Sequence, residues 1–169
     1  MPISERLEIA KKHIQSAREY TLFNLQELET DDWFWMPDGL TTHIAWQVGH
    51  LAMAQYGLTL FRQRGRSTDD KQLMSAQFRK RFMKGTTANP DRNEHPQPDE
   101  IMEVLNRVNE QMLVEIDGFD GEPLDEPIEM PYSVSPTRYG SLIFAGDHEM
   151  LHAGQIGMLR RLMGKDPIR

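Results

Sequence analysis

Apolar residues recur at steps of three and four along four long stretches of the chain, which is the period of an amphipathic helix. We predict helices over residues 4–29, 41–63, 99–117 and 139–164, with Thr41 or Thr42 as the cap of the second. No stretch shows the convincing alternation that is typical of a strand. The pattern therefore predicts an all-α protein, a four-helix bundle of the up-down kind with long connections.

Two long connections separate the predicted helices. Residues 64–98 are polar and rich in glycine and proline, with room for a short helix over 70–83, and residues 118–136 form a second proline-rich loop. Long loops inside compact domains are often lids or binding loops. An aromatic cluster at residues 33–36 either plugs the end of the bundle or lines a pocket mouth. We find no repeat or domain boundary, so residues 1–169 are expected to form a single domain.

The last predicted helix carries the most informative residues, His148 and His152. Two histidines four residues apart project from the same side of a helix, one turn above the other. They lie on a stripe whose other members are mostly apolar: Leu142, Ala145, Gln155, Leu159 and Leu162. Buried imidazoles need polar partners, and one shared metal ion would satisfy both. Gln155, on the same side, is a candidate for orienting a ligand from outside the coordination shell.

Metal sites in proteins usually have at least three protein ligands, so His148 and His152 need a third from elsewhere in the chain. His50 is our choice, because it lies on a small and apolar side of the second helix, as the later pair does. His43 shares that side but lies about 10 Å away along the helix axis, so it is expected at most to line the pocket. His13 is expected at the surface or its boundary, and His95 in an exposed loop.

Residues 148–152 also match the H-E-x-x-H signature of zinc proteases, in which the glutamate is the general base. The downstream ligand of those enzymes is missing here, since no histidine or glutamate follows His152. A zincin-like protease is therefore the weaker interpretation. Glu149 remains the candidate base of any metal chemistry. The equal alternative is that Glu149 is an acid on the helix surface that faces a neighbouring helix.

Composition narrows the function further. The chain has 38% hydrophobic and 27% charged residues, a net charge of −7 and no cysteine. An acidic chain without a compact basic patch is not expected to bind nucleic acid. No stretch has the apolar length of a membrane span, and the N-terminus has no apolar signal region. We therefore expect a cytoplasmic protein without a membrane partner.

The chain resembles the DinB/YfiT-like superfamily of metal-binding four-helix bundles over nearly its whole length. Residues 46–52 (WQVGHLA) and residues 148–156 (HEMLHAGQI) carry the resemblance. It implies that His50, His148 and His152 bind a divalent metal ion at one end of a pocket between helices. It also implies a homodimer, and either transfer or isomerisation with a low-molecular-weight thiol or metal-dependent hydrolysis of a small-molecule substrate.

Three hypotheses follow from these observations. The first is a metal-dependent enzyme of the thiol-transferase or hydrolase kind, the second a non-catalytic bundle that a metal braces, and the third a zincin-like protease. Imidazole ligands suit zinc, nickel and iron. The sequence therefore leaves the metal, the substrate and the thiol open.

Overall fold

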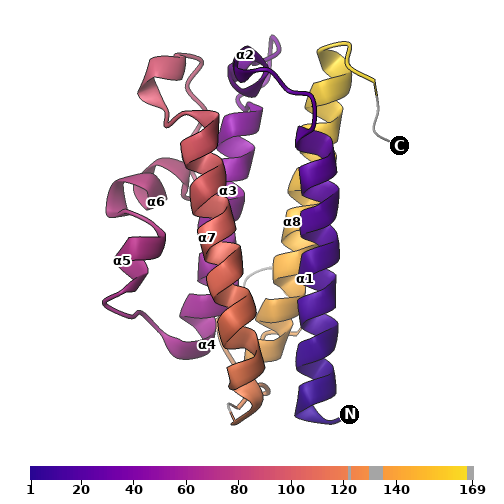
Figure 1. Ribbon diagram of the computed structural model, residues 1–169, viewed down its shortest axis with the longest axis vertical. Helices are drawn as coiled ribbons and strands as arrows, with labels where there is room; N and C mark the ends of the chain where they lie inside the picture. The colour runs from indigo at the N-terminus through magenta and orange to yellow at the C-terminus, as the bar shows by residue number, and fades with distance from the viewer. Residues whose placement is uncertain (122, 130–134, 167–169) are drawn as a thin grey trace.

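The computed structural model describes residues 1–121, 123–129 and 135–166, and this part of the chain is helical (Figure 1). Within it no strand is formed, and the one backbone bridge joins Pro127 to Thr137. The prediction of an all-α protein is confirmed. Among the described residues, no helix has both the length and the apolar character that a membrane crossing requires.

Four long helical segments lie side by side and contain the predicted stretches (Figure 1). They are α1 (Ile3–Leu25), α3 (Ile44–Gln55), α7 (Pro98–Ile116) and α8 (Arg138–Leu162), and α3 continues through a π-helical turn, η1 (Tyr56–Phe61), into α4 (Arg62–Arg64). The shorter elements are α2 (Thr30–Phe34), α5 (Asp70–Leu73), α6 (Ala76–Phe82), η2 (Arg92–Glu94) and η3 (Asp117–Gly121).

The long helices do not simply alternate in direction along the chain. Helices α1 and α8 are parallel, because residue numbers rise together in their contacts, from His13–Asp147 to Arg18–Glu149. Helix α7 is likewise parallel to α3 and its continuation α4, with contacts from Gln55–Asn109 to Arg64–Glu115. Contacts between α3 and α8 run in opposite directions, from Gln47–His152 to Leu58–Ser141. The reason is the long excursion through α5 and α6, which returns the chain to the end where α3 began (Figure 1).

The core forms where the apolar stripes of these helices meet. Six apolar residues at helical spacing on α7 are buried: Ile101, Val104, Leu105, Val108, Met112 and Ile116. The helix begins with a capping box between Gln97 and Glu100 and with Pro98 in its first turn. The aromatic pair Trp33 and Phe34 of α2 is also buried in this core. The cluster at residues 33–36 thus contributes two of its side chains to the interior.

Three local predictions were wrong. His43, rather than a threonine, caps α3, because its ring nitrogen accepts the Trp46 N–H at 3.0 Å. The predicted helix over 70–83 is divided into α5 and α6, since Met74 is extended and Ser75 starts a new helix by accepting the Phe78 N–H.

The third correction concerns α8, whose buried side is rotated from the predicted stripe. Glu149, Ala153 and Ile156 are buried, whereas Gln155 and Leu162 are exposed. The buried side faces the parallel helix α1, and the two histidines lie at its edge. This rotation turns His148 and His152 toward α3.

Candidate metal centre

Three histidines from two helices converge in the structure. The side chains of His50 on α3 and of His148 and His152 on α8 each offer a ring nitrogen within 4.8 Å of the other two. His50 is buried, and the other two are partly buried. At this spacing the three nitrogen atoms could hold one metal ion. His50 lies about a hundred residues before the other two, so only the fold brings the three together.

A hydrogen bond to the main chain fixes the ring of His50. Its Nδ1 lies 2.7 Å from the carbonyl oxygen of Phe82 at the end of α6. Because a carbonyl oxygen only accepts, Nδ1 carries the proton and Nε2 keeps its lone pair. The Trp46 ring is stacked on the same imidazole, with 4.9 Å between centroids and 6° between planes. Both contacts restrict the direction in which the free nitrogen points.

Close packing of α6 on α3 puts this carbonyl within reach. A Cβ atom at Gly49 would lie 2.5 Å from the Phe82 ring, a distance that side-chain packing does not tolerate. Glycine before His50 therefore allows Phe82 to rest on the backbone of α3 and present its carbonyl oxygen to the neighbouring histidine.

A glutamine orients His152 in the same way. The Nδ1 atom of His152 is hydrogen-bonded to Oε1 of Gln47, one turn before His50 on α3. The Gln47 amide is itself fixed by donation from Nε2 to the Thr42 hydroxyl at 2.9 Å. Nδ1 of His152 therefore donates and its Nε2 is left as the ligand atom. Gln47 was not among the site residues predicted from the sequence.

The electrostatics of the group favour a cation. Burial, followed by the neighbouring His50 ring, lowers the pKa of His148 to about 4. Burial and the two other rings lower the pKa of His152 to about 3, although a hydrogen bond with Gln155 raises it. Burial also lowers the pKa of His50. At neutral pH all three imidazoles are uncharged and have lone pairs available, as metal ligation requires.

Glu149 does not face this group. It is only 2% exposed, and its carboxylate accepts hydrogen bonds from Arg18 on α1, at 2.5 Å from Nε and 3.2 Å from Nη2. Arg18 also donates to Gln55 on α3 and to the Leu105 carbonyl on α7. Glu149 is therefore neither a surface acid nor positioned as a base beside the histidines. It belongs to a buried network that joins all four long helices.

The remaining predicted residues lie apart from the group. His43 and His95 contact each other, with ring centroids 4.8 Å apart, and both donate toward the Asn89 carbonyl. His95 is 8% exposed, so the prediction that it is exposed was wrong; the loop folds back against Phe34 and Phe82. His13, at the surface boundary as predicted, bonds to Asp147.

Three imidazole nitrogens, with the tautomers of His50 and His152 fixed by hydrogen bonds, suit a divalent ion such as zinc, nickel or iron. Among the described residues the group offers three ligands, one fewer than the four of a closed structural site. Gln155 is exposed one turn beyond His152 on α8, and its side chain raises the pKa of His152.

Comparison with known proteins adds the family. A family model described as the DinB superfamily matches residues 13–156, a range that contains all three histidines and the side chains that orient them. No curated protein matches the chain.

Proposed function

The chain belongs to the DinB superfamily, and from this premise we propose that it is a metal-dependent enzyme acting on a small molecule. In this proposal the long helices form the four-helix bundle of that superfamily, and Nε2 of His50, His148 and His152 bind one divalent ion. The observation that carries the proposal is the pair of acceptors, the Phe82 carbonyl and Gln47, which leave the Nε2 atoms of His50 and His152 free. Structural support of this kind is typical of metal-ligating histidines.

A divalent ion held by three imidazoles acidifies a thiol or water and polarises a carbonyl. The chain has no cysteine, so a thiol in the reaction would come from a low-molecular-weight co-substrate. Transfer or isomerisation with such a thiol, or hydrolysis, is therefore the proposed reaction class. Glu149 is held by Arg18, so the proton acceptor of this chemistry has to be a group other than Glu149.

The test combines metal loading with turnover. The full chain, loaded separately with zinc, nickel and iron, is assayed on thiol conjugates in the presence of small thiols and on ester and amide substrates. We expect turnover that is lost in His50→Ala and kept in His13→Ala, a matched control because His13 lies at the surface against Asp147. Stoichiometric metal with no turnover on either substrate class contradicts the proposal.

One observation favours a second function, a non-catalytic bundle braced by metal. The three ligands lie on α3 and α8, so an ion there would cross-link these two helices, and the hydrogen bond from His50 to the Phe82 carbonyl ties α6 to the ligand on α3. The brace predicts that His50→Ala lowers the melting temperature of the metal-loaded protein steeply with no activity to lose. The protease alternative has no support in the structure, because the glutamate of its motif is paired with Arg18.

A further inference from the structure

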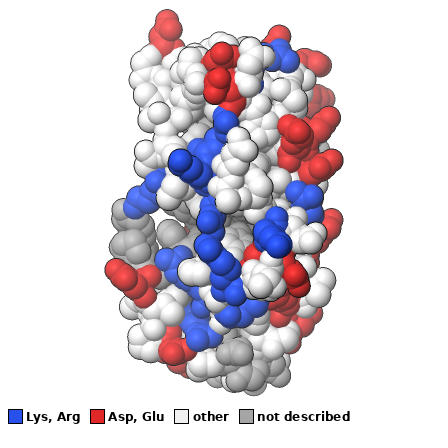
Figure 2. Space-filling view, turned by 90° about the vertical axis from the view of Figure 1, so that its left-hand side faces the viewer, with Lys and Arg blue, Asp and Glu red and all other residues white. Residues whose placement is uncertain are grey.

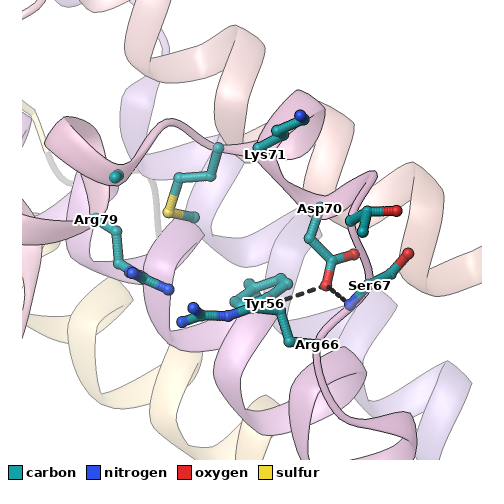
Figure 3. Close-up of a pocket in the computed structure, with 9 residues that line it drawn as sticks. Tyr56, Arg66, Ser67, Asp70, Lys71 and Arg79 are labelled. Carbon is teal, nitrogen blue, oxygen red and sulfur yellow. Dashed lines mark hydrogen bonds between the residues drawn. The ribbon is translucent and has the colours of Figure 1, made fainter.

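A cavity lies on the face of the molecule that carries α5 and α6. It has a volume of about 330 Å³ and is lined by Tyr56, Arg66, Lys71, Met74 and Arg79, among others (Figure 3). None of the three histidines of the metal centre lines it. Its floor is apolar, since the ring of Tyr56 and the side chain of Met74 are buried. We call this cavity the arginine pocket.

The acid that lines the arginine pocket is fully engaged elsewhere. Asp70 accepts from the Tyr56 hydroxyl at 2.8 Å, from the Ser67 N–H at 2.8 Å, and from Arg64 at 2.7 Å. Burial alone would raise the pKa of Asp70, but these hydrogen bonds lower it below its usual value. Asp70 is thus a charged structural acceptor, and its charge is balanced by Arg64 rather than by the arginines of the pocket.

Arg66 and Arg79 have no carboxylate partner in the ranges that the structure describes. Figure 3 shows their guanidinium groups extending toward each other from opposite sides of the pocket, Arg66 from the loop before α5 and Arg79 from α6. Two like charges that point at one space repel each other unless an anion lies between them. Lys71 on the rim points away but adds to the positive potential.

The surroundings of the pocket strengthen this potential. Lysine and arginine side chains run down the same face, and acidic side chains gather toward its edges (Figure 2). A narrow basic surface on a chain of net charge −7 attracts a compact anion, whereas an extended polyanion would meet the acidic edges.

We propose that the arginine pocket binds a small molecule that carries a compact dianion, a phosphate monoester or a dicarboxylate, on an apolar group. The two guanidinium groups bind the anion through paired N–H donors, the geometry that suits phosphate and carboxylate. The Tyr56 ring and Met74 contact the apolar group. This site is independent of the metal centre and of the function proposed for it.

Calorimetric titration of the full chain with phenyl phosphate, inorganic phosphate and succinate tests the proposal. We expect one molecule of phenyl phosphate to bind per chain, more tightly than inorganic phosphate because of the apolar floor, and with an affinity that falls as salt is added. Inorganic phosphate and succinate both lack the ring, so tighter binding of inorganic phosphate identifies phosphate esters as the ligand class, and the reverse order identifies dicarboxylates.

Variants locate the binding site. Arg66→Gln and Arg79→Gln are each expected to weaken binding about tenfold, whereas Lys80→Gln, an exposed basic residue of α6 outside the pocket, should change it less than about twofold. Arg66 is exposed, so its variant keeps the test open if Arg79→Gln does not fold.

Three results would overturn the proposal. They are no binding of any of the three probes, unchanged binding in both arginine variants, and binding that disappears when metal is stripped from the protein, which would locate the anion at the histidines.

Discussion

Arg18 and Glu149 form an ion pair in the interior of the helices, where the side chains are 6% and 3% exposed. The pair takes the glutamate of the H-E-x-x-H motif out of reach of the two histidines beside it. It also fixes the rotation of α8 about its axis, because Glu149 faces α1 while His148 and His152 turn toward α3. In this arrangement the glutamate of the motif pairs with α1, while its two histidines face α3.

Removing Arg18 should destabilise the protein strongly. Arg18→Met leaves a buried carboxylate without its partner, and we expect a loss of about 3–5 kcal/mol in the free energy of unfolding. Arg18→Met/Glu149→Met removes both charges, and most of the stability should return. Chemical denaturation of Arg18→Met, Glu149→Met and the double variant gives the coupling energy between the two side chains directly. If Glu149→Gln left stability unchanged and abolished turnover selectively, Glu149 would be a base after all.

Gln47→Leu tests the orientation of His152. The substitution removes the acceptor for Nδ1 and leaves the size of the side chain nearly unchanged, so metal affinity should fall by about 10–100-fold while the helix content is retained. Gln77→Leu, an exposed glutamine of α6, is the matched control and should bind metal as the wild type does. Competition with a chromophoric chelator measures both. Equal affinity of the two variants would remove Gln47 from the site.

Alanine substitutions at Gly49 and Gly154 distinguish the effect of close packing from that of helix propensity, because only Gly49 is packed against another side chain. Gly49→Ala places a methyl group against the Phe82 ring, 2.5 Å away, so α6 must shift; we expect a loss of about 1–3 kcal/mol together with weaker metal binding. Gly154→Ala meets nothing within 4 Å on α8 and should stabilise the protein by up to about 1 kcal/mol. Thermal denaturation measures both changes. A harmless Gly49→Ala would show that the contact between α6 and α3 is not needed.

The sequence contained much of the fold, because each long helix has its own apolar period. The buried positions of α7 follow its apolar period, and His50 stood out as a histidine on a small, apolar side of its helix. What a single helix cannot show is which distant side chain it will meet. Arg18 is one of several charged residues between the apolar positions of its helix, and only the parallel packing of α1 on α8 makes it the partner of Glu149.

The supporting residues of the site were missed for the same reason. Gln47 and His152 are separated by 105 positions, and the acceptor for His50 is a main-chain carbonyl, which carries no signal in the identity of Phe82. His95 was misplaced because its neighbours are turn formers. Its burial depends on Phe34 and Phe82, aromatic residues from two other segments.

Acid should destabilise the metal-free protein well above the range in which carboxylates titrate. Burial lowers the pKa of His43, His148 and His152 to about 4, 4 and 3, below the value near 6.5 of an unfolded chain. Between these values the unfolded state binds more protons, so the stability present above pH 6.5 is lost as the pH falls toward 4. The slope is about 1.4 kcal/mol per pH unit for each proton taken up on unfolding.

Urea denaturation of the metal-free chain at several pH values between 7.5 and 4.5 measures this slope. His95→Phe removes one further buried ring whose pKa burial lowers, and its profile should be shallower than that of the wild type. Stability that stays constant down to pH 5 would contradict the uncharged state of these histidines in the folded protein.

The central claim is that His50, His148 and His152 bind one ion together, and X-ray absorption on the metal-loaded full chain tests it most directly, with metal stoichiometry measured on the same samples. The account predicts one bound metal per chain with imidazole nitrogens from three histidines, a loss of affinity of at least about 100-fold in His50→Ala, and none in His13→Ala. A wild type that retains no metal, or a His50→Ala variant that binds it with unchanged affinity, would contradict the account.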